Sequence, residues 1–124
     1  MAVLDLEDAV STYGRLLGAE LEHRETLESQ GIEAVSVLVG EDRVELLTSL
    51  GEDTPVGRFL AKRGPGMHHV AYQVDDLGAE LEALAGEGFE LIDHEPRPGL
   101  YGLQIAFVHP DAVYGVLTEL VAHG

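Results

Sequence analysis

The sequence predicts an α+β protein in which a helix followed by three strands occurs twice. Three observations support this prediction. Segments with helical periodicity alternate with short runs of apolar and β-branched residues, and the order of these segments is the same in both halves. Residues at matching places recur at a nearly constant spacing, so that Val3 corresponds to Val74 and Glu45 to Glu119.

The first half begins with a helix. Asp5 is a typical N-cap and Gly18 a typical C-terminal residue, and the residues between them that recur at helical spacing are Leu6, Ala9, Val10, Tyr13 and Leu17. Strands are expected over residues 19–23, 32–39 and 43–50, with a turn at 40–42. Thr54 followed by Pro55 predicts a second helix that ends at Gly64.

The second half follows the glycine- and proline-rich residues 64–66. We expect a strand over HHVAYQV, a helix from about Asp76 to Ala85, and strands near 89–94, 103–109 and 115–122. The chain is therefore one domain, 1–124, made of module one (1–64) and module two (65–124).

The two modules can be placed in register. Val3, Asp5 and Leu6 match Val74, Asp76 and Leu77 at a spacing of 71, and the segment VELL at 44–47 matches TELV at 118–121 at a spacing of 74. Each final strand thus carries a glutamate at the same place. Subtracting 71 from His69 gives position −2, so the counterpart of this histidine falls before Met1.

Composition limits the classes of function. The chain has 124 residues, of which 45% are hydrophobic, and this suits one globular core. The net charge of −16 disfavours nucleic acid and anionic membranes as partners. There is no cysteine, no long apolar run and no leader-like segment, so a cytoplasmic protein is the expectation.

Several segments resemble one known family. The segments are VLDLEDAVSTYGRLLGAELEHRE, ESQGIEAV, RVELL, TPVGRFLAKRGPGMHHVAYQVDDL and HPDAVYGVLTELV. They are similar to methylmalonyl-CoA epimerases of the vicinal oxygen chelate superfamily, the glyoxalase and bleomycin resistance fold. The resemblance implies two βαβββ modules whose strands form a curled mixed sheet, with the first strand of module one truncated. It also implies epimerisation of a small-molecule CoA thioester and a homodimer.

The resemblance implies a metal site at Glu45, His69 and Glu119, whereas the family's first-strand histidine has no counterpart. One imidazole and two carboxylates suit Co²⁺ foremost, with Zn²⁺, Mn²⁺, Ni²⁺ or Mg²⁺ as alternatives. A single strand glutamate is more often solvated or paired with arginine. Three explanations of the missing histidine stay open: a late start of the chain, a water or partner-subunit residue in its place, or loss of the metal.

For the reaction, the family's mechanism implies a metal-stabilised enediolate and carboxylates that move the α-proton. Glu119 matches a position proposed as both ligand and base. The second base falls at Ala34, with Glu33 one residue earlier, and a displacement of one residue turns a strand side chain to the opposite face. A bulge that rescues Glu33, another base, or loss of epimerisation are the alternatives.

Candidate substrate-binding residues are Gln73, His109, Arg58 and Lys62. Gln73 could share a face with His69, His109 could border the pocket or only cap a turn, and the two helix cations could attract a polyanion or only pair with nearby carboxylates. His68 should point away from His69 and be structural. A different metalloenzyme of the same superfamily, such as a glyoxalase-like isomerase or a dioxygenase, and a noncatalytic ligand-binding protein are the alternative functions.

Overall fold

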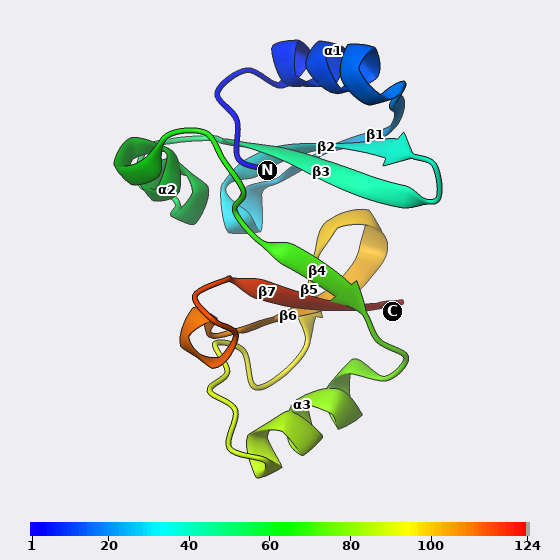
Figure 1. Cartoon of the computed structure of the whole chain (residues 1–124). Coiled ribbons are helices and arrows are strands. Elements are labelled where there is room, and N and C mark those ends of the chain that lie inside the picture. Colours follow the sequence, from blue (N-terminus) through cyan, green and yellow to red (C-terminus); the bar gives the residue numbers. More distant parts are fainter. Residues whose placement is uncertain (124) are drawn as a thin grey trace. The chain divides into compact units, whose positions relative to one another are not determined.

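A computed structural model describes residues 1–123 and divides into two compact units. Unit 1 is Met1–His68 and unit 2 begins at His69. Unit 1 contains α1 (Leu6–Leu17), β1 (Glu20–Leu27), the 3-10 turn η1 (Glu28–Gln30), β2 (Ile32–Val39), β3 (Asp42–Ser49) and α2 (Pro55–Arg63), as Figure 1 shows. Unit 2 contains β4 (Val70–Gln73), α3 (Leu77–Gly86), β5 (Arg97–Pro98), η2 (Leu100–Gly102), β6 (Leu103–Val108), η3 (Pro110–Ala112) and β7 (Thr118–His123).

Unit 1 is a three-stranded antiparallel sheet, β1-β2-β3, with α1 on one face (Figure 1). The Asp5 side chain starts α1 by accepting a hydrogen bond from the Asp8 N–H at 3.1 Å. Apolar residues of the helix and of the covered sheet face form one core: Leu6, Ala9, Val35, Val37 and Leu46. Because strand side chains alternate between faces, the residues between these on β2 and β3 lie on the face that α1 does not cover.

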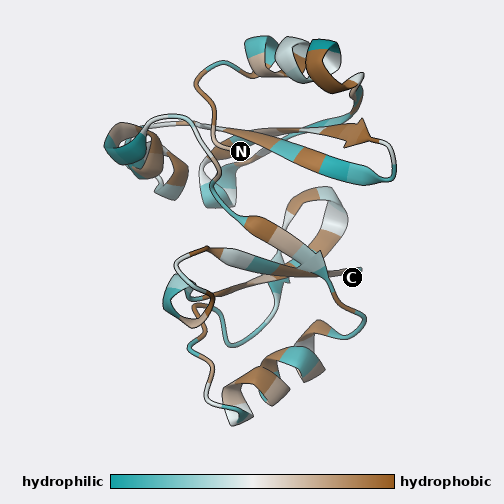
Figure 2. Cartoon of the chain, in the orientation of Figure 1, coloured by the Kyte–Doolittle hydropathy of each residue, from teal (hydrophilic) through white to brown (hydrophobic). Residues whose placement is uncertain are grey.

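Unit 2 is a four-stranded sheet in the order β4-β7-β6-β5, with β4 parallel to β7. One face packs against α3 through a second core: Leu77, Leu81, Leu91, Ala106, Val108, Leu120 and Ala122. Both α1 and α3 carry hydrophobic as well as hydrophilic residues, as Figure 2 shows. Each unit therefore has its own core, built from one amphipathic helix and one sheet face.

Hydrogen bonds confirm the predicted repeat. The Val3 N–H donates to the Leu47 carbonyl at 2.8 Å, and the Val74 N–H donates to the Val121 carbonyl at 2.8 Å. These four residues are related by the spacings of 71 and 74 found in the sequence. The N-caps match too, because Asp76 accepts from the Ala79 N–H at 3.1 Å as Asp5 does in unit 1.

Four predicted strands differ from the structure. The strand expected over HHVAYQV is shorter, because β4 spans only Val70–Gln73 and both histidines precede it. β1 continues to Leu27 instead of ending at His23. Residues 89–94 form no regular strand and make one bridge, Leu91 to Val108, while the short β5 follows at Arg97. β7 begins at Thr118 and not at 115, because Tyr114 and Gly115 have φ angles of 57° and 85° that suit a turn and not a strand. The α+β fold itself is confirmed.

Candidate functional site

Unit 2 brings together two residues that the sequence singled out. Glu119 is the second residue of β7, opposite Phe107 of β6 and Ala71 of β4. His69 directly precedes β4, and its Nε2 atom lies 3.6 Å from Oε2 of Glu119. The two side chains are only 7% and 10% exposed. The sequence therefore identified a buried carboxylate and imidazole that are adjacent in space.

The surroundings of this pair are partly aromatic. The Phe107 ring meets the His69 ring edge-on, with centroids 5.8 Å apart, and the Arg97 guanidinium lies 5.3 Å from the centre of the Phe107 ring. Gln73 is the cross-strand neighbour of Val121, two residues beyond Glu119, so it shares the face of Glu119. This is the face opposite the core that α3 covers, and it leaves Gln73 exposed.

Unit 1 holds Glu45 in β3, where it is the cross-strand neighbour of Ser36. The Met1 amino group donates to the Glu45 carbonyl oxygen at 2.8 Å. Burial raises the pKa of the Glu45 carboxyl above its ordinary value, against the opposing effect of the Met1 ammonium and Arg43. Burial lowers the pKa of the Met1 amine, and the Glu45 charge opposes this shift.

Further charged groups share with Glu45 the face of the unit 1 sheet that α1 does not cover. A β-bulge between Leu21 and His23 makes Glu22 the extra residue of β1. The Glu22 carboxylate accepts hydrogen bonds from the Ser36 hydroxyl at 2.8 Å and from the Arg43 guanidinium at 2.8 Å. These two hydrogen bonds lower the pKa of Glu22 to about 2. Glu22 is thus held as a carboxylate on the same face.

A second group on this face escaped the sequence reasoning. The His23 Nε2 atom lies 3.0 Å from Oε1 of Glu25, and Glu25 is the cross-strand neighbour of Ala34. The signal was present in the sequence: His23 and Glu25 are two residues apart and so share a strand face. Because β1 was expected to end at His23, Glu25 was left outside it.

The pairing of β2 places the two residues named for the second base. β2 pairs with β3 without a break from Ile32 to Val39, and β1 has its irregularity at Glu22. Glu33 therefore lies on the face of Val35 and Val37, which α1 covers, and its carboxylate is 3.9 Å from Arg24. Ala34 lies on the opposite face, with Ser36.

The remaining named residues have local partners. The His109 Nδ1 atom accepts a hydrogen bond from the Asp111 N–H at 3.1 Å and caps η3. Arg58 pairs with Asp53 at 2.9 Å, and Lys62 lies exposed in the last turn of α2. The His68 ring packs edge-on against Phe59 with centroids 5.1 Å apart, and burial lowers the pKa of His68. For His109 and Arg58, these contacts match the structural roles, capping a turn and pairing with a carboxylate, that were the alternatives to substrate binding.

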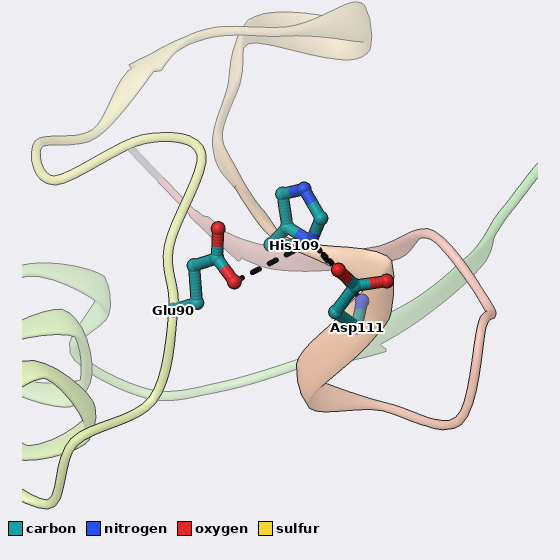
Figure 3. A group of neighbouring side chains, drawn as sticks. All are labelled: Glu90, His109 and Asp111. Carbon is teal, nitrogen blue, oxygen red and sulfur yellow. Dashed lines mark hydrogen bonds and ion pairs between the residues drawn. The ribbon is translucent and has the colours of Figure 1, made fainter.

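Within residues 1–123, one group of side chains could hold a metal ion at a place where the sequence did not predict a site. Ligand atoms of Glu90, His109 and Asp111 lie within 4.8 Å of one another (Figure 3). Nδ1 of His109 is 3.8 Å from Oε2 of Glu90 and 3.8 Å from Oδ2 of Asp111. Both carboxylates are exposed, and Nδ1 already serves as a hydrogen-bond acceptor. A cation here would have to displace that capping bond.

The pair in unit 2 fits a metal better. His69 and Glu119 offer a nitrogen and a carboxylate oxygen, a donor set that borderline divalent ions accept. Two ligand atoms at about 2.1 Å from one ion lie roughly 3 to 4 Å apart, and the observed separation is 3.6 Å. Burying a carboxylate is costly unless a cation or donor meets it. The residues present therefore suit a divalent ion at this pair.

Comparison with known proteins reveals a family and its members. The profile of the Glyoxalase/Bleomycin resistance protein/Dioxygenase superfamily matches residues 1–107. The human mitochondrial methylmalonyl-CoA epimerase is 36% identical over 97% of this chain and 69% of its own length. The uncharacterized protein YqjC of Bacillus subtilis is 40% identical over 97% of this chain and 86% of its own.

Solved structures give the same result. The Mycobacterium tuberculosis methylmalonyl-CoA epimerase superimposes with a TM-score of 0.94 at 36% identity, covering 99% of this chain and 83% of that one. A methylmalonyl-CoA epimerase in complex with methylmalonyl-CoA and NH₄⁺ superimposes with a TM-score of 0.94 at 35% identity, over 99% of this chain and 90% of the other.

The helices formed by residues 1–123 include none long and apolar enough to cross a membrane.

Proposed function

Because this chain belongs to the Glyoxalase/Bleomycin resistance protein/Dioxygenase superfamily, we propose that it epimerises methylmalonyl-CoA, the activity named for its relatives. The observation that carries the proposal is the buried pair of His69 and Glu119 on the sheet face that α3 does not cover. A carboxylate with only a structural role would be less costly at a position that water can reach. A substrate with an acidic C–H bond gives these residues a chemical task.

The proposed chemistry removes the proton at C2, between the thioester and the carboxylate, and returns it to the opposite side. Glu119 takes or gives this proton as a general base or acid. The His69 imidazole lies 3.6 Å from the Glu119 carboxylate, the Phe107 ring packs against His69, and little of either side chain is exposed to water. Excluding water strengthens the electrostatic interactions on which proton removal depends.

We propose that Glu45, His69 and Glu119 hold a divalent ion, with Co²⁺ as the first ion to test. When bound, the ion would stabilise the negative charge that develops on the substrate oxygens. Gln73 is the candidate for substrate contact on the same face as Glu119. A CoA thioester as ligand, a homodimer and a cytoplasmic location complete the proposal.

The replacement Glu119→Gln tests this function. It keeps the size of the side chain but removes its ability to accept the proton, and we expect deuterium uptake at C2 of methylmalonyl-CoA in D₂O to fall at least about 100-fold. Uptake is followed by NMR with the metal-depleted protein and with added Co²⁺. We expect uptake only after the addition.

The matched control is Glu28→Gln, which makes the same change of charge in η1 and should exchange like the unmodified protein. Near-normal uptake by the Glu119→Gln protein would exclude Glu119 as the base. Absence of uptake by the folded, unmodified protein with Co²⁺ would exclude the proposed function.

A further inference from the structure

Methylmalonyl-CoA, the proposed substrate, is an anion both at its acyl carboxylate and at its CoA phosphates. Unit 2 carries many aspartates and glutamates, and like charges repel, so binding an anion there needs a compensating positive group. Arg97 is the only lysine or arginine among residues 69–124. Within unit 2, a permanent positive charge on a side chain can therefore come from Arg97 alone.

Arg97 lies on the same sheet face as Glu119. In β5 it is the cross-strand neighbour of Ile105, and directly opposed residues of antiparallel strands point to the same side. Ile105 stands two residues before Phe107 in β6, and Phe107 is the cross-strand neighbour of Glu119 in β7. Strand alternation thus puts these four side chains on one face, opposite the core that α3 covers.

An aromatic contact supports this placement. The Arg97 guanidinium carbon lies 5.3 Å from the centre of the Phe107 ring, and the same ring packs against the His69 imidazole with centroids 5.8 Å apart. A guanidinium placed over an aromatic ring is attracted to it. Phe107 therefore connects Arg97 with the imidazole that neighbours Glu119.

The partners of Arg97 hold its stem and leave its outer edge for a ligand. Within residues 1–123 its side chain makes one hydrogen bond, from Nε to Oδ2 of Asp93 at 3.2 Å, and the same oxygen accepts the Phe107 N–H at 2.9 Å. A guanidinium has five N–H donors, and a hydrogen bond through Nε leaves those of the two terminal nitrogens. The Arg97 side chain is 41% exposed, so these donors can reach a bound molecule.

The backbone around Arg97 is stiff. Pro96 and Pro98 flank it, and a residue that precedes a proline is restricted to extended conformations. The next residue, Gly99, is tied to β6 because its N–H donates to the Leu103 carbonyl at 2.9 Å. A side chain carried by such a segment loses less freedom when it binds a ligand.

We propose that Arg97 binds an anionic oxygen group of the thioester substrate through its two terminal NH₂ groups. The identity of the ligand rests on the proposed function. The planar fork of a guanidinium matches a carboxylate or a phosphate, and hydrogen bonds between charged groups are stronger than those between neutral ones. The contact of Phe107 with both Arg97 and His69 favours the acyl carboxylate, because the CoA phosphates lie at the far end of the pantetheine arm from C2.

Binding measurements on the Arg97→Met protein test this assignment. The replacement removes the charge and keeps an unbranched stem that can pack on Phe107. Isothermal titration calorimetry with Co²⁺ present compares three ligands. These are racemic methylmalonyl-CoA, in which turnover causes no net change; isobutyryl-CoA, in which a methyl group replaces the acyl carboxylate; and racemic methylmalonyl-pantetheine, which has no phosphate.

The pattern of affinities identifies the group that Arg97 binds. For the acyl carboxylate, we expect the Kd of both methylmalonyl ligands to rise at least about 10-fold and that of isobutyryl-CoA to change less than about 2-fold. For a phosphate, both CoA ligands should bind more weakly and methylmalonyl-pantetheine should bind as before. Either pattern supports an anion site at Arg97.

Two variants complete the experiment. Arg97→Lys keeps a positive charge but not the planar fork, and it should restore part of the lost affinity. The matched control is Arg15→Met, which removes a charge from the exposed last turn of α1 and should bind all three ligands like the unmodified protein. Thermal unfolding of each variant establishes that it is folded.

Unchanged Kd values for all three ligands would overturn the assignment, and so would an equal rise for all three, because that pattern indicates a disturbed structure. Deuterium uptake at C2 by the unmodified protein is recorded in parallel. If uptake is absent while Arg97→Met weakens binding selectively, the proposed function fails and the anion site stands. Normal uptake with unchanged Kd values gives the reverse result. An unmodified protein that binds none of the three ligands would remove both.

Discussion

At the scale of single residues, the pairing of strands decides which chemically active side chains become neighbours. Distance along the sequence does not. Glu45, His69 and Glu119 could be named from the sequence because each belongs to a motif. The His69–Glu119 contact confirms that two of them are neighbours in space. Glu25 could not be named, because its place depends on which residue of β2 it faces, and that register is fixed only when the strands pair.

Glu22 gives a residue-scale prediction about acid stability. Its folded-state pKa of about 2 lies below the ordinary value of 4.5, because Arg43 and Ser36 bind the charged form. A lowered pKa stabilises the folded state above pH 4.5, and this contribution disappears as the pH falls from about 4.5 to about 2. We therefore expect the unfolding free energy of the Glu22→Gln protein to fall less steeply over this range.

Urea unfolding at several pH values within that range measures this difference. Glu28→Gln serves as the control, since it removes a carboxylate without breaking the contacts of Glu22, and its curve should run parallel to that of the unmodified protein. Equal slopes for Glu22→Gln and the unmodified protein would mean that the pair with Arg43 does not stabilise the fold.

At the scale of elements, helices were predicted better than strands. Asp5 was recognised as a cap, and Thr54 and Asp76 as residues near which helices start; each accepts a hydrogen bond from the backbone N–H three residues later. A strand was predicted over residues 89–94 because the pattern of apolar residues there is typical of a strand. There the Asp93 carboxylate accepts the Phe107 N–H at 2.9 Å, so a side chain replaces part of the ladder of backbone hydrogen bonds. Single-sequence periodicity does not show such a replacement.

Two glycines in helices give a prediction at the scale of elements. The same replacement by alanine should stabilise the protein at one position and destabilise it at the other. A Cβ atom at Gly14 of α1 would meet the Ala19 carbonyl oxygen at 3.7 Å, an ordinary contact, so Gly14→Ala should stabilise the protein by about 0.5 to 1 kcal/mol. A Cβ atom at Gly57 of α2 would lie 2.2 Å from the Gly51 oxygen. Gly57→Ala should therefore destabilise by roughly 1 to 3 kcal/mol.

Thermal or urea unfolding of the two variants under one set of conditions compares the same chemical change in two helices. A stabilised Gly57→Ala protein would show that the start of α2 can move away from Gly51 at little cost.

At the scale of the whole molecule, the repeat could be read from the sequence because equivalent residues keep their spacing. In unit 1, β1 forms one edge of the three-stranded sheet, and most of its residues are exposed. An uncovered edge of this kind favours pairing with another chain. We expect a homodimer with twice the mass of the 13.3 kDa chain.

Sedimentation equilibrium over a range of protein concentrations measures that mass. A single species of 13.3 kDa at all concentrations would contradict the dimer. The control is the same measurement at high salt, because the net charge of −16 opposes association and is screened there.

The bulge at Glu22 also bears on how this protein can change during evolution. Strand residues on either side of a bulge keep their own partners, so this is where β1 can lose or gain one residue while the rest of the strand stays in register. A descendant that lacks Glu22 would still hold Glu25 opposite Ala34. A deletion between His23 and Glu25, in contrast, would turn Glu25 toward α1. Length variation among descendants should therefore be tolerated at the bulge, whereas a deletion just after it would turn the following side chains to the opposite face.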